Sequence, residues 1–282
     1  MLGLDPDPAR LWPAALAAAP DAGAVAERAA AAVTAHCRAV IDAAGPACVA
    51  IKPQLACFER LGAAGWAALA RTVEHAHAAG LLVLADGKRG DIDVSAAAYA
   101  QALAGGTPTP FGEAPGLGAD AFTVNPYMGR DTLAVLAAGA RAGGAGVFVL
   151  VRTSNPGAAD VEDLEVAGGG TVWERVAALV TGLDEPGAAP LSDVGAVVGA
   201  TAPEHIGRLR DLMPRAPFLL PGVGAQGGRV EDLAPAFAPG RAAGLVTASR
   251  SIVAAHEQAG GDPGAASRAE AERLRAAAWD LS

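Results

Sequence analysis

The chain has 282 residues, enough for one large α/β domain or two small ones, and barrels of this size commonly form a single domain. Its net charge of −9 and isoelectric point near 5.0 argue against nucleic acid as the main partner. The cationic residues are also scattered along the sequence and form no basic stripe. No apolar stretch reaches membrane length and no basic segment follows Met1, so we expect a soluble protein without a membrane partner.

Short apolar runs alternate with longer alanine-rich segments, a pattern typical of parallel strands joined by crossover helices. Strands are predicted at Leu2–Leu4, Ala47–Ile51, Leu81–Ala85, Ala119–Val124, Gly146–Val151, Val194–Val198, Phe218–Leu220 and Gly244–Thr247. Helices are predicted near residues 23–43, 65–79, 94–104, 130–142, 171–182, 203–212, 229–237 and 250–258. The series predicts a (β/α)8 TIM barrel that forms one domain over residues 1–282. An open doubly wound sheet is the alternative, but its usual early G-x-G-x-x-G fingerprint is absent.

Several segments lie outside this repeat. Residues 105–118 and 183–190 are rich in turn formers and are predicted to be inserted loops. Residues 259–282 begin with a Gly-Gly turn and close with a helix, expected at 262–280, that packs outside the barrel. Only four residues precede Asp5, fewer than a barrel strand normally needs, so the first strand is expected to be truncated. We expect Met1 not to be the natural start, and a barrel that closes with a short first strand is the alternative.

The cysteines and histidines give no evidence of a metal site. Cys37, Cys48 and Cys57 are odd in number and lack C-x-x-C spacing, which favours unpaired core residues in a reducing cytoplasm over disulfides or zinc. His75 and His77 fall on different faces of a predicted helix and cannot both face one ion. We therefore expect no metal.

The stretch ADGKRGDID, residues 85–93, places charged side chains at the end of the third predicted strand. Side chains two apart on a strand share a face, so Asp86 and Lys88 are expected to point the same way, with Asp91 on the following turn. Charges at such a position cost desolvation free energy, which favours a chemical role. A strand-end salt bridge with a helix cap is the alternative.

Other predicted strands also end in polar residues, where the active site of a barrel lies. These residues are Asp5, Lys52, Asn125 and the segment 153–157. Each one alone is typical of a hydrogen-bonded turn, but together with the charged cluster they predict an active site.

The last two predicted strands lead into a candidate phosphate site. A glycine-rich loop at 221–228 offers backbone N–H groups to an oxyanion. Arg250 lies at the start of the next predicted helix, where its guanidinium can make a forked contact with a phosphate and the helix dipole adds a favourable field. A flexible loop with a surface arginine is the alternative. Phosphate at one side and a Lys/Asp cluster at the other imply a phosphorylated small molecule.

Taken together, these motifs are similar to those of the orotidine 5'-monophosphate decarboxylase family. The resemblance covers nearly the whole chain, and two of the motifs are typical of the family's bacterial branch. It rests on DGKRGDI at 86–92, VNPYMG at 124–129, RTSNPGA at 152–158, PGVGAQGG at 221–228 and SRSI at 249–252. Ser249 stands where many relatives have glycine, but its N–H remains available. The resemblance implies conversion of orotidine 5'-monophosphate to uridine 5'-monophosphate without a cofactor.

The resemblance also implies roles for individual residues. The charged catalytic network comprises Lys52, Asp86, Lys88 and Asp91. The residues implied to bind substrate are Asp5, Ile92, Ser95, Ser154, Pro221, Gln226 and Arg250. Among them, Asp5 acts with Lys52 on the ribose hydroxyls, and Ser154 recognises the pyrimidine edge. The loop residue Gln226 holds the phosphate together with Arg250.

The family's active sites are shared between two subunits, so the resemblance implies a homodimer. Asp91 and Ile92 reach the neighbouring subunit's site, and Ser95 assists from across the interface. In the implied mechanism, loss of CO₂ leaves a carbanion at C6 in the plane of the ring, which Lys88 stabilises and then protonates. Asp86 disfavours the ground state by lying near the substrate carboxylate.

Two other functions fit parts of the pattern. A decarboxylase or aldolase of sugar phosphates shares the D-x-K-x-x-D strand but usually adds a metal-binding carboxylate. A nucleotide-binding barrel without catalytic activity would serve as a structural or regulatory subunit. Release of CO₂ from orotidine monophosphate, measured with and without a chelator, separates the three.

Overall fold

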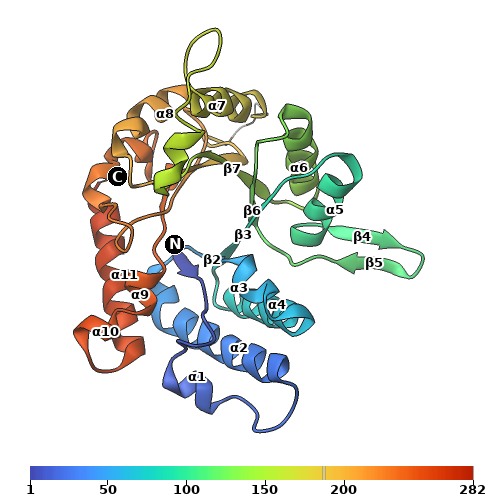
Figure 1. Ribbon diagram of the computed structural model, residues 1–282, viewed down its shortest axis with the longest axis vertical. Coiled ribbons are helices and arrows are strands. Elements are labelled where there is room, and N and C mark those ends of the chain that lie inside the picture. The colour runs from blue at the N-terminus through green and yellow to red at the C-terminus, as the bar shows by residue number, and fades with distance from the viewer. Residues whose placement is uncertain (186, 188, 282) are drawn as a thin grey trace. The chain divides into compact units, whose positions relative to one another are not determined.

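The structure is a computed structural model that describes residues 1–185, 187 and 189–281 (Figure 1). Its contacts cluster into two compact units. Unit 1 comprises Met1–Gly87 and Ala248–Arg275, and unit 2 comprises Lys88–Thr247 with the residues from Ala276 onward. Each unit is described by itself.

Unit 1 is built on the first three barrel strands, which pair in parallel. They are β1 (Leu2–Leu4), β2 (Ala50–Pro53) and β3 (Leu82–Arg89), whose last residues lie in unit 2. The residues of β1 and β2 are all buried, as expected for parallel strands covered on both faces. Ala248, two residues beyond the last strand of the chain, pairs with Leu2 on the other edge of β1.

The helices of unit 1 lie between these strands and after Ala248. They are α1 (Pro13–Ala17), α2 (Val25–Ala44), α3 (Leu55–Glu59), α4 (Gly62–Ala78), α9 (Arg250–Val253), α10 (His256–Ala259) and α11 (Pro263–Asp280), whose last residues lie in unit 2, with a 3-10 turn η1 (Gly45–Ala47). In α2 the buried residues Val33, Cys37, Val40 and Ile41 recur at helical spacing and form the face that packs inward.

Unit 2 contains the other five barrel strands, which also pair in parallel. They are β6 (Ala121–Val124), β7 (Gly146–Arg152), β8 (Val194–Val198), β9 (Phe218–Leu220) and β10 (Gly244–Val246). The helices are α5 (Asp93–Leu103), α6 (Arg130–Ala142), α7 (Val172–Gly182) and α8 (Ile206–Leu212). The 3-10 segments are η2 (Pro156–Asp160), η3 (Pro203–His205), η4 (Val230–Phe237) and η5 (Arg241–Ala243).

The strand order is β1-β2-β3-β6-β7-β8-β9-β10, which is the order of the strands along the chain. Eight parallel strands in sequence order, joined by helices, are the topology of a (β/α)8 barrel, so the predicted fold class is confirmed. Each predicted strand is present. β2 begins at Ala50 and not at Ala47, because residues 45–47 form the 3-10 turn η1, and β3 continues to Arg89.

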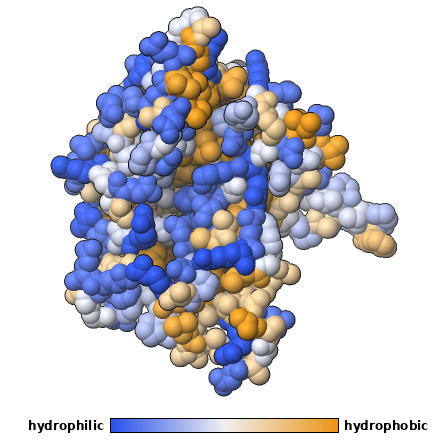
Figure 2. All heavy atoms as spheres, in the orientation of Figure 1, coloured by the Kyte–Doolittle hydropathy of each residue, from blue (hydrophilic) through white to orange (hydrophobic). Residues whose placement is uncertain are grey.

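The predicted loop at 105–118 is wrong. This segment is an antiparallel hairpin of β4 (Gly106–Thr109) and β5 (Gly112–Pro115). The Thr109 hydroxyl closes its turn, because it donates to the Gly112 carbonyl oxygen at 2.6 Å and accepts from the Phe111 N–H. In Figure 2 the hairpin stands out from the surface on the right, and Phe111 at its tip is fully exposed.

Two predicted helices are also wrong in detail. The segment near 229–237 is the 3-10 helix η4, because Pro235 has no N–H to donate within an α-helix. The segment near 250–258 is broken into α9 and α10. The terminal helix expected at 262–280 is α11. In the predicted loop 183–190, residues 186 and 188 lie outside the described residues.

Among the described residues, no helix has both the length and the apolar character needed to cross a membrane.

Candidate active site

Unit 1 holds a buried ion pair between the ends of neighbouring strands. Lys52 on β2 lies with its Nζ atom 2.5 Å from Oδ2 of Asp86 on β3, and the two residues are only 7% and 5% exposed. The Gln54 side-chain amide donates to the same carboxylate oxygen at 3.2 Å. The sequence predicted Lys52 and Asp86 but not Gln54, although Gln54 follows Lys52 by two residues at the same strand end.

Breaking this pair is expected to destabilise the protein strongly. Lys52→Met removes one partner of a buried ion pair, a change that typically costs about 3–5 kcal/mol. The free energy of unfolding, measured by denaturant titration, should fall by that amount. The matched control is the double variant Lys52→Met with Asp86→Leu, which removes both charges and should regain much of the loss. A single variant as stable as the wild type would contradict the expectation.

Lys88 adopts an unusual backbone conformation at the end of β3. Its φ angle is +48°, in the left-handed region that non-glycine residues rarely occupy, and its N–H donates to the buried Thr123 hydroxyl on β6 at 2.9 Å. Backbone strain of this kind costs about 1–3 kcal/mol and concentrates at functional sites. The expectation that Asp86 and Lys88 share a face assumed regular strand alternation, and the backbone at Lys88 departs from it.

The turn after β3 presents Asp91, Ile92 and Ser95 near the start of α5. The Asp91 carboxylate accepts the Ile92 N–H at 2.8 Å, which fixes the turn. Ile92 and Val94 are 55% and 83% exposed, and Ser95 is exposed in the first turn of the helix. Large apolar side chains are therefore exposed beside the predicted catalytic Asp91.

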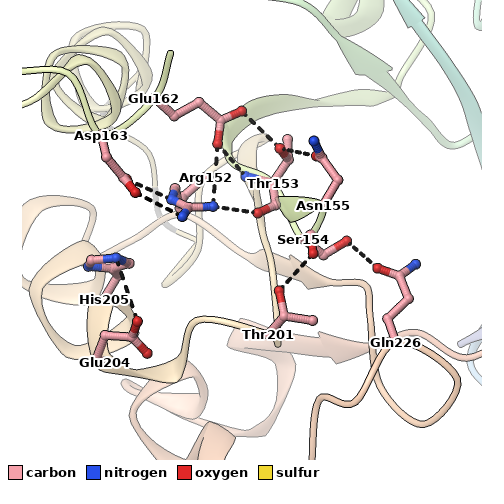
Figure 3. Close-up of polar contacts among 10 residues, drawn as sticks. All are labelled: Arg152, Thr153, Ser154, Asn155, Glu162, Asp163, Thr201, Glu204, His205 and Gln226. Carbon is pink, nitrogen blue, oxygen red and sulfur yellow. Dashed lines mark hydrogen bonds and ion pairs between the residues drawn. The ribbon is translucent and has the colours of Figure 1, made fainter. Parts of the chain in front are cut away.

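The end of β7 and the glycine-rich loop after β9 meet in unit 2 (Figure 3). The Ser154 hydroxyl donates to the Gln226 amide oxygen at 2.8 Å, so two residues that the sequence assigned to different parts of the substrate are in direct contact. Gly222 has a φ of +101°, and a Cβ there would lie 3.1 Å from side-chain carbons of Ser154 and Thr201. Only glycine fits this position without displacement.

Pro221 lies at the start of the same loop, where its carbonyl oxygen accepts the Ala200 N–H at 2.8 Å. In unit 1, Asp5 is exposed directly after β1, and Arg250 is exposed at the start of α9. Because α9 has only four residues, the predicted contribution of a helix dipole to phosphate binding at Arg250 is small.

The distribution of lysine is a signal that the sequence prediction missed. Among the 21 cationic residues the chain has only two lysines, Lys52 and Lys88, and both lie at the ends of barrel strands. Every other cation is arginine. A lysine can give up its proton at accessible pH, whereas arginine stays protonated.

Charged and polar residues at the carboxyl ends of parallel strands define a (β/α)8-barrel enzyme, and the glycine-rich loop after the seventh barrel strand is typical of barrels that bind a phosphorylated small molecule. The chain belongs to the orotidine 5'-phosphate decarboxylase / HUMPS family, whose family model matches residues 2–263. The resemblance inferred from the motifs is thereby confirmed.

Relatives of known name support this assignment. The orotidine 5'-phosphate decarboxylase of Rhodopirellula baltica is 45% identical over 234 residues, which cover 81% of this chain and 75% of the relative. The solved structure of Leishmania donovani OMP decarboxylase matches with a TM-score of 0.70 and 31% identity, covering 99% of this chain and 93% of that one. The Leishmania donovani UMP synthase structure matches with a TM-score of 0.71 and 32% identity, and this chain spans only 53% of its length.

Proposed function

We propose that the protein is a carboxy-lyase that converts orotidine 5'-monophosphate to uridine 5'-monophosphate, the last step of de novo pyrimidine biosynthesis. Membership of the family and the names of its relatives support this activity. The single observation that carries the proposal within this chain is the restriction of lysine to two strand ends. A reaction that ends with protonation of a carbanion needs a proton donor, and lysine can serve as one whereas arginine cannot.

In the proposed mechanism, CO₂ leaves from C6 of the pyrimidine, and the electron pair of the broken bond stays on C6. The π system of the ring cannot delocalise this pair, so the site stabilises it electrostatically through the Lys88 ammonium, which then donates a proton to C6. Asp86, paired with Lys52, disfavours the substrate carboxylate. Asp91 completes the charged network. The barrier reduction required is up to roughly 20 kcal/mol.

The remaining contacts to substrate are assigned by motif and by the local geometry of each residue. Asp5 and Lys52 bind the ribose hydroxyls, Ser154 recognises the pyrimidine edge, and Gln226 holds the phosphate together with Arg250. Pro221 lies at the start of the phosphate loop.

The direct test of the proposed activity is CO₂ release from orotidine 5'-monophosphate with and without a chelator. Absence of CO₂ release in both conditions would contradict the proposed activity, and loss of release on chelation would favour a metal-dependent relative.

The proposal includes a homodimer in which Asp91, Ile92 and Ser95 act at the partner's site. The exposed apolar side chains of Ile92 and Val94 support it, because a dimer interface would cover them. We also propose that the chain is one barrel domain and acts in the cytoplasm, where unpaired cysteines such as the buried Cys37 stay reduced.

Removal of the Arg250 side chain is expected to weaken catalysis through a group that does not react. Arg250→Ala should raise KM steeply and lower kcat/KM, since binding energy from the phosphate is used at the reacting carbon. Steady-state kinetics with orotidine, which lacks the phosphate, should show almost no effect of the same variant. Arg268→Ala, an exposed arginine on α11, is the control. Equal losses with both substrates would assign Arg250 a structural role.

A further inference from the structure

A buried arginine ends β7 immediately before the segment that carries Ser154. Arg152 is 8% exposed, and its guanidinium forms a forked pair with Asp163, with Nε–Oδ1 and Nη2–Oδ2 distances of 2.8 and 3.0 Å. Its Nη1 atom donates to the Thr153 carbonyl oxygen at 2.8 Å and lies 3.7 Å from a carboxylate oxygen of Glu162. One cation thus contacts two carboxylates and the backbone next to Ser154 (Figure 3).

Glu162 contacts the N–H and the hydroxyl of Thr153, the residue whose carbonyl oxygen accepts from Arg152. One of its carboxylate oxygens accepts the Thr153 N–H at 2.8 Å, and the other lies 2.9 Å from the Thr153 hydroxyl. The N–H and the carbonyl of Thr153 are therefore both fixed by charged side chains. Thr201 fixes the next residue, because its hydroxyl donates to the Ser154 carbonyl oxygen at 2.9 Å.

The backbone of the segment that carries the two carboxylates is anchored to the start of α7. The Trp173 N–H donates to the Glu162 carbonyl oxygen at 2.9 Å, and Trp173 is buried. The helix begins at a capping box in which the Glu174 carboxylate accepts the Thr171 N–H at 3.0 Å. The support for Thr153 thus extends from the end of β7 to a rigid helix start.

This arrangement is better suited to fixing geometry than to stabilising the fold. Desolvation offsets most of the attraction in a buried ion pair, so apolar residues at the same positions often stabilise a fold equally well. A forked guanidinium contact, by contrast, fixes the relative orientation of the groups that it joins. The residue that follows Thr153 is Ser154, whose hydroxyl donates to the Gln226 amide oxygen at 2.8 Å. We propose that Arg152, Glu162 and Asp163 form a positioning clamp that orients Ser154 toward the pyrimidine base of the substrate.

The clamp rests on the proposed function, in which Ser154 recognises the base. The group that it positions recognises the base, so loss of the clamp should be visible as a change in selectivity between two ligands. Uridine 5'-monophosphate and ribose 5-phosphate share the sugar and the phosphate, and only the first has a pyrimidine. Residues that position Ser154 should therefore affect binding of the first ligand more than binding of the second, which they reach only through the Ser154–Gln226 hydrogen bond.

The test is calorimetric titration of both ligands into Arg152→Lys, Glu162→Gln and Asp163→Asn. Each variant should bind uridine 5'-monophosphate at least about fivefold more weakly, as expected for one misplaced hydrogen bond, and ribose 5-phosphate within about twofold of wild type. Asp160→Asn is the matched control, because Asp160 is an exposed carboxylate in the same loop. It should change neither affinity.

Several outcomes would overturn the clamp. Equal weakening of both ligands would mean that these residues only maintain the fold, and unchanged affinity for uridine 5'-monophosphate would mean that Ser154 is oriented without them. Should Arg152→Lys not fold, Glu162→Gln carries the test, because it keeps the shape of the side chain. If the wild type releases CO₂ but the variants show no selective loss of affinity for uridine 5'-monophosphate, only the clamp is refuted. A wild type that neither releases CO₂ nor binds uridine 5'-monophosphate refutes both proposals.

Discussion

Replacing Lys88 by alanine is expected to lower kcat for decarboxylation at least about 100-fold, because general acid catalysis alone typically contributes 10²–10⁴-fold. The variant also loses the charge proposed to stabilise the C6 carbanion, so the total loss should exceed that minimum. Single-turnover measurement of CO₂ release from orotidine 5'-monophosphate reports the chemical step directly. Retention of more than about a hundredth of wild-type kcat would contradict an essential acid at this position.

A second substitution separates the two roles of Lys88. Lys88→Arg keeps a cation at the strand end but removes the transferable proton, since arginine does not deprotonate in proteins. The activity of this variant should remain well below that of the wild type.

Amine-selective labelling reports directly on Lys88, because Lys52 and Lys88 are the only lysines and Lys52 is buried whereas Lys88 is exposed. Uridine 5'-monophosphate should protect Lys88 from the reagent.

Mixing two inactive variants is expected to restore activity. If Asp91 acts in the partner's site, a dimer of one Lys88→Ala chain and one Asp91→Ala chain has one site with both wild-type residues and one with neither. Random pairing of equal amounts in a twofold dimer makes half of the dimers mixed, so about a quarter of all sites regain both residues. Activity should therefore rise from near zero to about a quarter of wild type.

The control for this experiment is the mixture of each variant with an inactive chain that carries both substitutions. That mixture can form no intact site and should stay inactive. Exchange of subunits is followed separately, with differently tagged chains. Exchange without any recovery of activity would show that Asp91 serves its own chain's site.

The alternation of buried strands and helices could be predicted from the sequence because parallel strands covered on both faces are continuous apolar runs. The runs at Val194–Val198 and Phe218–Leu220 gave strand limits that agree with β8 and β9. The hairpin at 106–115 could not be predicted in this way, because its exposed strands have no apolar pattern and contain prolines. Its pairing depends on the turn at Thr109, where one hydroxyl bonds to two backbone groups.

The candidate site, too, contains residues that the sequence could indicate and residues that it could not. Lys52, Asp86, Lys88 and Asp91 could be named as candidates from the sequence because strand ends and short motifs are local features. Glu162 and Asp163 were not found, because an acidic pair in a loop has no pattern that distinguishes it from a solvated surface. Only the folded chain places them within hydrogen-bonding distance of the end of β7.

The sequence by itself was sufficient to predict the barrel topology and to name the charged candidates for the active site, because hydrophobic period and motif spacing act over a few neighbouring positions. The tertiary structure decided which of these residues meet. It pairs Lys52 with Asp86 and Ser154 with Gln226, and it holds Lys88 at a positive φ against Thr123. These contacts join residues from 34 to 72 positions apart, and no local propensity encodes a contact at that separation.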